Sequence, residues 1–375
     1  MENTLVQTEA GCFSFITDEG VERMNKKELA FLKEITDLGG TSGGEAAVRD
    51  YLRGKYEGLA DRVTTDGLGS LMAELSGEGP RILAVGHMDE VGFMVRAITN
   101  DGFVKFSRCG YFFSTGVLSQ HFVIQTEQGD IDAFCAIGPE GAKDGKLPEI
   151  DQLVMDIGCS SKEEAKALGV AVGDYIVPKG GFTQLGPKKN YLVNKAWDNR
   201  IGCAVALRVM ERLKKEGHPN TFIGGGSVQE EVGTRGAKTL GYLAEAEIGF
   251  SIDVGIADDM PGGAHEGISL GKGPELCFMD SGTISNRKLL KFAVKVAEEC
   301  GIPYQTSIMK HGGTDAEEFQ HIRSGMPVLL INVPSRYAHT PTSMICYEDY
   351  ENTVKLVTEM VKRLDRETVD RIRTF

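Results

Sequence analysis

The sequence is short of basic residues, aromatic residues and long apolar runs. Its 41 lysines and arginines face 54 aspartates and glutamates, so the formal net charge is −13. This balance argues against a nucleic-acid phosphate backbone as a partner. No apolar stretch approaches the roughly 18 residues that a membrane-spanning helix needs. One tryptophan and 7% aromatic residues are also few for the stacking platforms of a polysaccharide cleft.

Signals for export and for a disulfide framework are missing as well. The first residues, MENTLVQTEAGCFSF, carry early acidic residues and lack a basic region followed by an apolar run, so we expect a cytoplasmic protein without a secretory signal. Eight cysteines are scattered with no C-x-x-C pair. In a cytosolic chain this pattern favours buried thiols over disulfides or a zinc knuckle.

Two kinds of pattern divide the chain. Residues 1–94 and 194–375 alternate amphipathic helical segments with apolar strand-like runs such as RILAVGHMDEVGFMV and MPVLLINV. This alternation predicts an α/β catalytic domain of αβα type, with a largely parallel sheet. Residues 95–193 instead show short alternating runs separated by glycine and aspartate turns, which predicts a small β-rich inserted domain, a barrel or PDZ-like.

Polar donors follow the apolar strands of the α/β part, where ligands bind in such sheets. The candidates are His87, Asp198, Glu230, Glu231, Asp253 and His339. Nitrogen and oxygen donors of this kind suit zinc, cobalt or manganese. One metal would use about three of the groups, whereas two metals that share a bridging carboxylate would use five.

The two adjacent glutamates need separate roles. Glu230 and Glu231 stand where the strand TFIGGGSVQ ends, so regular alternation lapses and both side chains can reach one cavity. We assign Glu231 as a metal ligand and Glu230 as the general base that takes a proton from water and returns it to the leaving amine. Asp89, two residues after His87, can accept the other imidazole N–H and orient the ring.

Some of these residues have rivals or simpler roles. Asp198 could be only the N-cap of the following helix, Asp258 or Asp259 could replace Asp253, and His311 is the second choice after His339. Thr314 and Asp315, in GGTDA, are either substrate contacts or merely a glycine turn and a helix cap.

Other enzyme classes fit less well. Gly40 to Gly44, GTSGG, matches G-x-S-x-G, but a helical pattern precedes it where a nucleophile elbow needs a strand,; Ser42 and Glu45 fit a helix capping box instead. Neighbouring glutamates suit a glycosidase poorly, because its carboxyl groups stand about 5–9.5 Å apart across the sugar bond. No Walker or dinucleotide-binding motif is present,. The closest alternative is a metal-dependent deacylase or amidohydrolase of small N-acyl compounds.

The motifs HMDEVGF, WDNRIG, QEEVGTRGA, SIDV, GKGP, GGTDA and RYAHTP occur in this order between about Lys26 and Met360. Together they resemble the cytosolic dinuclear metallo-aminopeptidases. These are glutamyl aminopeptidase-like enzymes of tetrahedral, dodecameric assembly, often also labelled cellulases or endoglucanases. Residues before Lys26 have no counterpart in this resemblance.

The resemblance implies a hydrolase that removes N-terminal residues from short peptides with free amino termini. It implies two divalent metal ions per subunit, zinc or cobalt before manganese, and a homo-oligomer, a dodecamer, assembled through the insert. It also implies a cis peptide bond after Asp198. The implied roles of the residues are as follows: His87 and Asp253 hold one metal, Glu231 and His339 the other, Asp198 bridges them, Glu230 is the general acid and base, and Asp89 orients His87.

Overall fold

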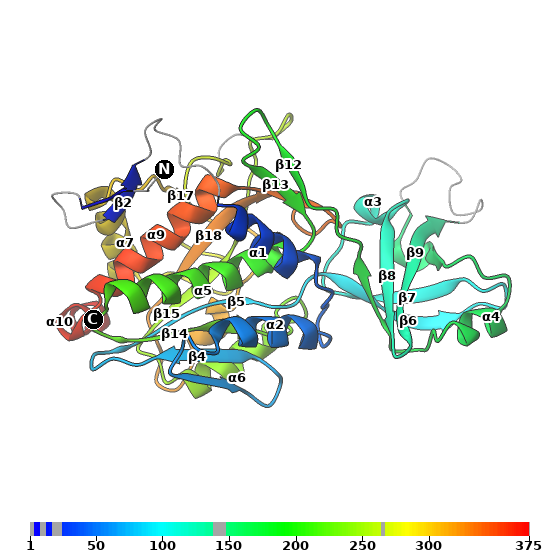
Figure 1. The fold of residues 1–375 in the computed structure, drawn as a ribbon, viewed down its shortest axis with the longest axis horizontal. Coiled ribbons are helices and arrows are strands. Elements are labelled where there is room, and N and C mark those ends of the chain that lie inside the picture. The colour runs from blue at the N-terminus through cyan, green and yellow to red at the C-terminus, as the bar shows by residue number, and fades with distance from the viewer. Residues whose placement is uncertain (1–3, 8–12, 17–24, 138–147, 264–266, 375) are drawn as a thin grey trace.

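The computed structural model describes residues 4–7, 13–16, 25–137, 148–263 and 267–374 (Figure 1). A small hairpin of β1 (Thr4–Gln7) and β2 (Phe13–Ile16) stands apart from two larger units, a mixed sheet of 11 strands and a closed six-stranded barrel. The predicted α/β fold with a β-rich insert is confirmed, and the insert is a barrel. In Figure 1 the barrel lies at the opposite end of the molecule from the C-terminal helix.

Four parallel strands form the centre of the large sheet. They are, in spatial order, β18 (Val328–Arg336), β15 (Ile248–Ile256), β5 (Arg81–His87) and β14 (Thr221–Ser227). Their residues are almost all buried, because helices cover both faces of a parallel sheet. These strands all point their carboxyl ends toward the same edge of the sheet.

Antiparallel strands complete the sheet on both sides. Beyond β14 lie β4 (Leu71–Leu75) and β3 (Arg62–Thr65); beyond β18 lie β19 (Ser343–Cys346), β13 (Tyr191–Asn194) and β12 (Thr183–Leu185). β16 (Glu275–Cys277) also pairs with β18, and β17 (Gln305–Ser307) pairs with β16. The sheet is therefore mixed, with a parallel centre.

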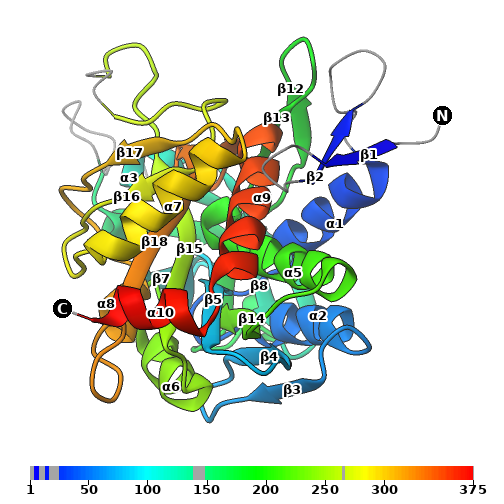
Figure 2. The same ribbon diagram turned by 90° about the vertical axis from the view of Figure 1, so that its left-hand side faces the viewer.

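The faces of the sheet bury different cores, because neighbouring residues of a strand point to opposite sides. Ile82 and Ala84 of β5 pack with one cluster, whereas Leu83 and Val85 pack with another. The first cluster joins α1 (Lys26–Asp37), α2 (Ala46–Tyr56), α5 (Trp197–Glu216), α7 (Arg287–Glu299), α9 (Tyr347–Arg363) and α10 (Arg366–Arg373). The second joins α6 (Arg235–Ala244) and α8 (Ala316–Phe319), and Figure 2 shows α6 across the sheet from α5.

The barrel has a core of its own. Its strands run in the order β10 (Leu153–Asp156), β7 (Val104–Cys109), β6 (Gly92–Ile98), β11 (Tyr175–Pro178), β8 (His121–Thr126) and β9 (Gly129–Ile137). Phe93 lies at the centre, with its ring 4.5 to 5.6 Å from those of Phe106, Phe112 and Phe122. Short helical segments α3 (Ser114–Val117), η2 (Ile150–Gln152) and α4 (Lys162–Ala167) connect the strands. The boundaries of the inserted domain, between residues 94 and 95 and between residues 193 and 194, stay a prediction.

The cysteine expectation holds in part. Six described cysteines are free thiols, five of them buried: Cys109, Cys135, Cys203, Cys277 and Cys346, with Cys159 partly exposed. The expectation is wrong for Cys300, which is disulfide-bonded, and Cys12 lies outside the described residues. Among the described helices, none combines the length and the apolar character needed to span a membrane.

Helix α5 crosses the sheet at a point where only glycine fits. A Cβ on Gly202 would lie 2.2 Å from the carbonyl oxygen of Ile252 in β15, and one on Gly86 of β5 would lie 2.6 Å from the backbone carbon of Gly202. Backbone atoms of two strands and one helix cannot give way as a side chain can. This close approach fixes the start of α5, which carries Asp198, above the strand ends.

Gly202→Ala should lower the free energy of unfolding by about 3 kcal/mol, because overpacking against backbone has no cheap relaxation. Gly54→Ala is the matched control: Gly54 lies in α2 with no atom within 4 Å of an added Cβ. That change should raise stability by about 0.5–1 kcal/mol through helix propensity. Urea unfolding measures both, and a Gly202→Ala midpoint equal to that of the wild type would contradict the packing argument.

Candidate active site

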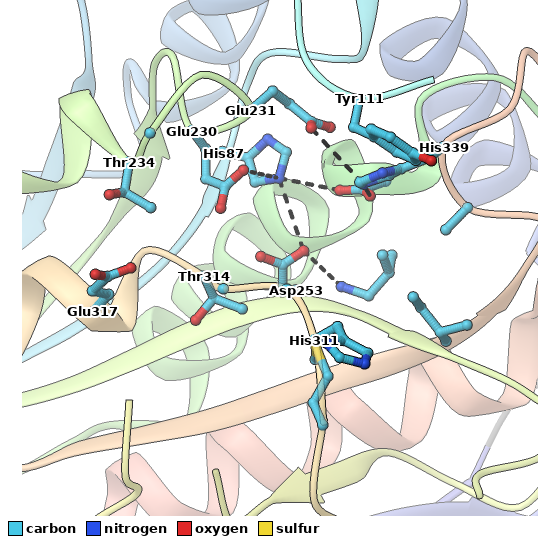
Figure 3. A pocket seen from close by; sticks show the side chains of 18 residues that line it. His87, Tyr111, Glu230, Glu231, Thr234, Asp253, His311, Thr314, Glu317 and His339 are labelled. Atoms are coloured by element: carbon cyan, nitrogen blue, oxygen red, sulfur yellow. Dashed lines mark hydrogen bonds and ion pairs between the residues drawn. The ribbon is translucent and has the colours of Figure 1, made fainter. Parts of the chain in front are cut away.

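The predicted donors meet at the carboxyl edge of the parallel strands (Figure 3). His87 is the last residue of β5, and Asp253 lies in the second half of β15. Asp198 occupies the non-helical first turn of α5, and the Asp198–Asn199 peptide bond is cis, as the resemblance implied. The Glu230–Glu231 pair follows β14, and His339 lies in the turn between β18 and β19.

Asp198 stands between the two histidines. Its Oδ1 atom lies 3.1 Å from Nε2 of His87, and its Oδ2 atom lies 3.3 Å from Nε2 of His339. His87 Nε2 is also 3.7 Å from Glu230 Oε2 and 3.9 Å from Asp253 Oδ1. On the other side, His339 Nε2 is 3.8 Å from Glu231 Oε2. All six candidate donors of the sequence analysis therefore lie in one cluster.

Within the described residues, two triplets have possible ligand atoms within 4.8 Å of one another. They are His87 with Asp198 and Glu231, and His87 with Glu230 and Asp253. Glu231 Oε1 is buried and has no hydrogen-bond partner. A buried carboxylate oxygen without a donor is costly unless a cation compensates it. The residues present therefore fit divalent metal ions.

The electrostatics of the cluster point the same way. Burial raises the pKa of Glu231 to about 8, and the neighbouring Asp198 carboxylate raises it as well. Burial likewise raises the pKa of Glu230 and of Asp253 well above their usual range. Burial lowers the pKa of His339, but the hydrogen bond to Asp198 outweighs it and brings the value to about 9. Carboxylates crowded in this way need positive charge between them.

Asp89 contacts more than the His87 ring. Its side chain is completely buried, and its Oδ1 atom lies 3.4 Å from His87 Nδ1. The same carboxylate accepts hydrogen bonds from the backbone N–H groups of Glu230, at 3.0 Å, and Glu231, at 3.2 Å. Asp89 thus joins the end of β5 to the loop that carries both glutamates.

The capping-box interpretation of Ser42 and Glu45 is wrong. The Ser42 hydroxyl donates a hydrogen bond of 2.6 Å to Asp89 Oδ2, and the helix α2 has no side-chain cap. The Glu45 carboxylate instead accepts from the backbone N–H groups of Gly43, at 2.9 Å, and Gln229, at 3.0 Å. The loop between α1 and α2 therefore contacts both Asp89 and the segment before Glu230 through side chains whose partners a helix-cap motif does not predict.

A buried ionic group holds the start of α5 beside this loop. The Glu90 carboxylate accepts from Lys195 Nζ and, at 3.4 Å, from Arg200 Nη2. Lys195 also donates to the Leu38 carbonyl at 2.8 Å, and Arg200 to the Gly40 carbonyl at 3.1 Å. Lys195 and Arg200 flank Asp198, so their contacts anchor the backbone on both sides of it.

A cavity of about 320 Å³ opens onto the cluster. One wall comes from the barrel: Tyr111 lines the cavity, with its ring 6.1 Å from that of His339. The backbone N–H of Phe113 donates to the His339 carbonyl at 3.4 Å. No pattern in the sequence indicated this wall, because Tyr111 lies in a loop of the insert.

Some of the remaining candidate residues line the cavity and others do not. Thr314 lines the cavity, whereas Asp315 is not among the lining residues, and its buried carboxylate accepts from the Ser227 hydroxyl. Asp259 forms two hydrogen bonds with Arg336, at 2.6 and 2.7 Å, and is therefore not a rival to Asp253. His311 lines the same cavity as His339. Thr234 and Glu317 also line it; Thr234 lies within the QEEVGTRGA motif and Glu317 directly after GGTDA, but neither was among the predicted site residues.

An α/β fold with two imidazoles and four carboxylates at its strand ends defines the class of metallohydrolases. Within this class, the chain belongs to the M42 family: a profile described as M42 glutamyl aminopeptidase matches residues 69–356. The family makes the protein a metal-dependent aminopeptidase, a hydrolase of peptide bonds.

Individual relatives agree over nearly the whole chain. The lysyl aminopeptidase of Pyrococcus furiosus is 31% identical over 341 residues, which are 89% of this chain and 96% of that protein. The crystal structure of the TET aminopeptidase from the marine sediment archaeon Thaumarchaeota archaeon SCGC AB-539-E09 has a TM-score of 0.89 at 37% identity, covering 93% of this chain and 100% of the other. The Pyrococcus horikoshii TET1 peptidase, described as able to assemble into a tetrahedron or a large octahedral shell, has a TM-score of 0.82 at 30% identity, covering 90% and 100%.

Ser42→Ala should weaken metal binding or turnover by about 10-fold, as loss of a supporting hydrogen bond does in metal sites. The variant removes one donor from Asp89 while every direct candidate ligand remains. Metal titration can be followed by fluorescence of Trp197, the only tryptophan, which is buried next to Asp198. Ser324→Ala, at an exposed loop position, is the control; equal behaviour of both variants would contradict the supporting role of Ser42.

Proposed function

We propose that this aminopeptidase removes residues one at a time from short peptides with free amino termini, at a centre of two divalent metal ions. The observation that carries the proposal is the position of Asp198, whose two carboxylate oxygens face different histidines. A carboxylate placed in this way suits a bridge between two cations. Zinc or cobalt is expected before manganese because the resemblance to the dinuclear metallo-aminopeptidases implies it; imidazole and carboxylate donors by themselves suit all three ions.

The residues divide into two sets around this bridge. His87 and Asp253 would hold one ion, Glu231 and His339 the other, and Asp198 both; the distances of 3.1 to 3.9 Å between donor atoms on each side support this division. When bound, such ions supply Lewis acidity, which acidifies water and polarises a carbonyl group.

Glu230 is left over once five ligands are assigned, and it is the proposed general acid and base. Its carboxylate takes a proton from the attacking water and carries it to the nitrogen of the departing amine. Asp89 keeps this carboxylate in position through the backbone N–H of Glu230. Glu230 also lies within ligand distance of His87 and Asp253, so its role as a base must be separated from a role as a ligand.

The closest alternative is a deacylase that uses the same centre on small N-acyl compounds. The family favours a peptide with a free amine, and the cavity of about 320 Å³ is suited to one residue and the bond that follows it. Thr314 remains the proposed substrate contact on the wall formed by the start of α8, and Asp315 stays a prediction in that role.

Self-association into a homododecamer is part of the proposal. The support is the resemblance over 90% of the chain to a peptidase that assembles into closed shells, and we assign the contacts to the barrel. A closed shell would admit only short or unfolded peptides. The cytoplasm remains the predicted compartment.

Glu230→Gln should keep the bound metal and lose at least about 100-fold in kcat, because the amide cannot carry the proton. Asp198→Ala should lose metal, because it removes the carboxylate that both histidines face. Metal content after dialysis and kcat are measured for the two variants. Near-normal turnover of Glu230→Gln, or loss of its metal, would show that Glu230 is not the base described here.

A library of short peptides, half with free and half with acetylated amino termini, tests the reaction itself. The metal-loaded protein should shorten the free peptides one residue at a time and leave the acetylated ones intact, as followed by mass spectrometry. Removal of acetyl groups without shortening would instead establish the deacylase.

A further inference from the structure

The cavity has an acidic group that the metal centre does not use. Glu317, in the first turn of α8, lines the cavity together with Thr234 and Thr314. Figure 3 shows Glu317 on the same side as Thr234, away from His339. Among the hydrogen bonds and ion pairs of the described residues, none involves the Glu317 carboxylate. A charge without a partner in a substrate cavity is available to a ligand.

The backbone around Glu317 holds its side chain in place. A Cβ on Gly282 would lie 2.4 Å from the Glu317 carboxyl carbon, so the carboxylate packs directly on this glycine. The turn at Gly282 is rigid, because Asp280 accepts from its N–H at 2.8 Å and Gln320 donates to its carbonyl at 2.6 Å. The carboxylate is thus positioned in advance, which lowers the entropic cost of binding a cation.

The charges of the other lining residues favour a cationic ligand. Among the described residues that line the cavity, none is lysine or arginine, so outside the proposed metal centre an acidic substrate side chain would find no cationic side chain to pair with. Of the histidines among the described lining residues, His87 and His339 belong to the proposed metal donors, and His311 remains. Met309 and Ile256 provide apolar surface in the same cavity, on which the methylene stem of a long cationic side chain can pack.

We propose that Glu317 selects peptides whose first residue carries a cationic side chain, lysine above all. The inference rests on the proposed aminopeptidase activity. Glutamyl and lysyl names both occur among the relatives, so similarity alone does not decide between an acidic and a basic first residue. The structure favours a basic first residue through one unpaired carboxylate and through the absence of lysine and arginine from the part of the lining that the structure describes.

Lysine and norleucine as first residues form the critical pair, because norleucine lacks the ammonium group but keeps an unbranched apolar chain. We expect kcat/KM for the lysine peptide to exceed that for the norleucine peptide by about 10-fold or more, the value of a hydrogen bond to a charged group. The ratio should fall as salt is added, because the cavity is open to solvent. A glutamate-first peptide should be the slowest of the three.

Glu317→Gln should bring the lysine-to-norleucine ratio close to one and leave the norleucine rate unchanged. Glu318→Gln is the matched control, since the next residue of α8 lines a different cavity; it should leave both rates unchanged. The salt dependence of the wild-type ratio provides a test that needs no variant to fold.

Three outcomes would overturn the inference. Equal rates for lysine and norleucine in the wild type, or fastest cleavage of the glutamate peptide, would show that Glu317 does not set the preference. An equal loss for both peptides in Glu317→Gln would mean that Glu317 binds the α-amine instead. Hydrolysis of norleucine and glutamate peptides without a lysine preference overturns this inference alone, whereas no hydrolysis of any peptide also overturns the proposed function.

Discussion

The buried carboxylate of Asp89 is the interaction on which the site depends. Parallel strands bring the donors to one edge of the sheet, but the loops beyond the strands have no ladder to hold them. Asp89 supplies hydrogen bonds where the strands no longer pair. Its carboxylate accepts hydrogen bonds from the Ser42 hydroxyl and from the backbone N–H groups of Glu230 and Glu231, and it lies beside the His87 ring. Hydrogen bonds to an ionised carboxylate are stronger than those between neutral groups, so one side chain can fix several loops.

A second layer of charge supports the first. Glu90, the neighbour of Asp89, binds Lys195 and Arg200 in a fully buried group. Buried ion pairs often add little net stability, because desolvation offsets their attraction. Here they determine position instead, since both cations flank Asp198 and also bind carbonyl groups of the loop between α1 and α2. These contacts tie the segment that carries Asp198 to the loop between α1 and α2, beside the other donors.

Much of the fold and centre could be predicted from the sequence. Strands were predicted from apolar runs that either alternate with polar residues or are continuous. Helical periodicity predicted α1, α5 and α9, and each donor stood next to the end of a predicted strand or in an adjoining loop. What the sequence could not supply was the environment of polar residues in loops. Ser42 and Glu45 matched a helix cap by spacing alone, yet their partners are Asp89 and Gln229, far away in the chain. Tyr111 reaches the cavity because the barrel lies beside the sheet, and Glu317 does so because α8 packs on the sheet near the strand ends; no local pattern encodes either position.

The donors are spread along the chain from His87 to His339, with the barrel inserted between the first and the second of them. A ribosome makes the chain from its N-terminus, so the full donor set cannot exist until nearly all of it has been synthesised. A chain that ends after Asp253 already carries five of the six donors, but it lacks His339, so one side of the centre is incomplete. The complete centre can therefore form only late in the synthesis of each molecule, after the residues of the barrel have been made.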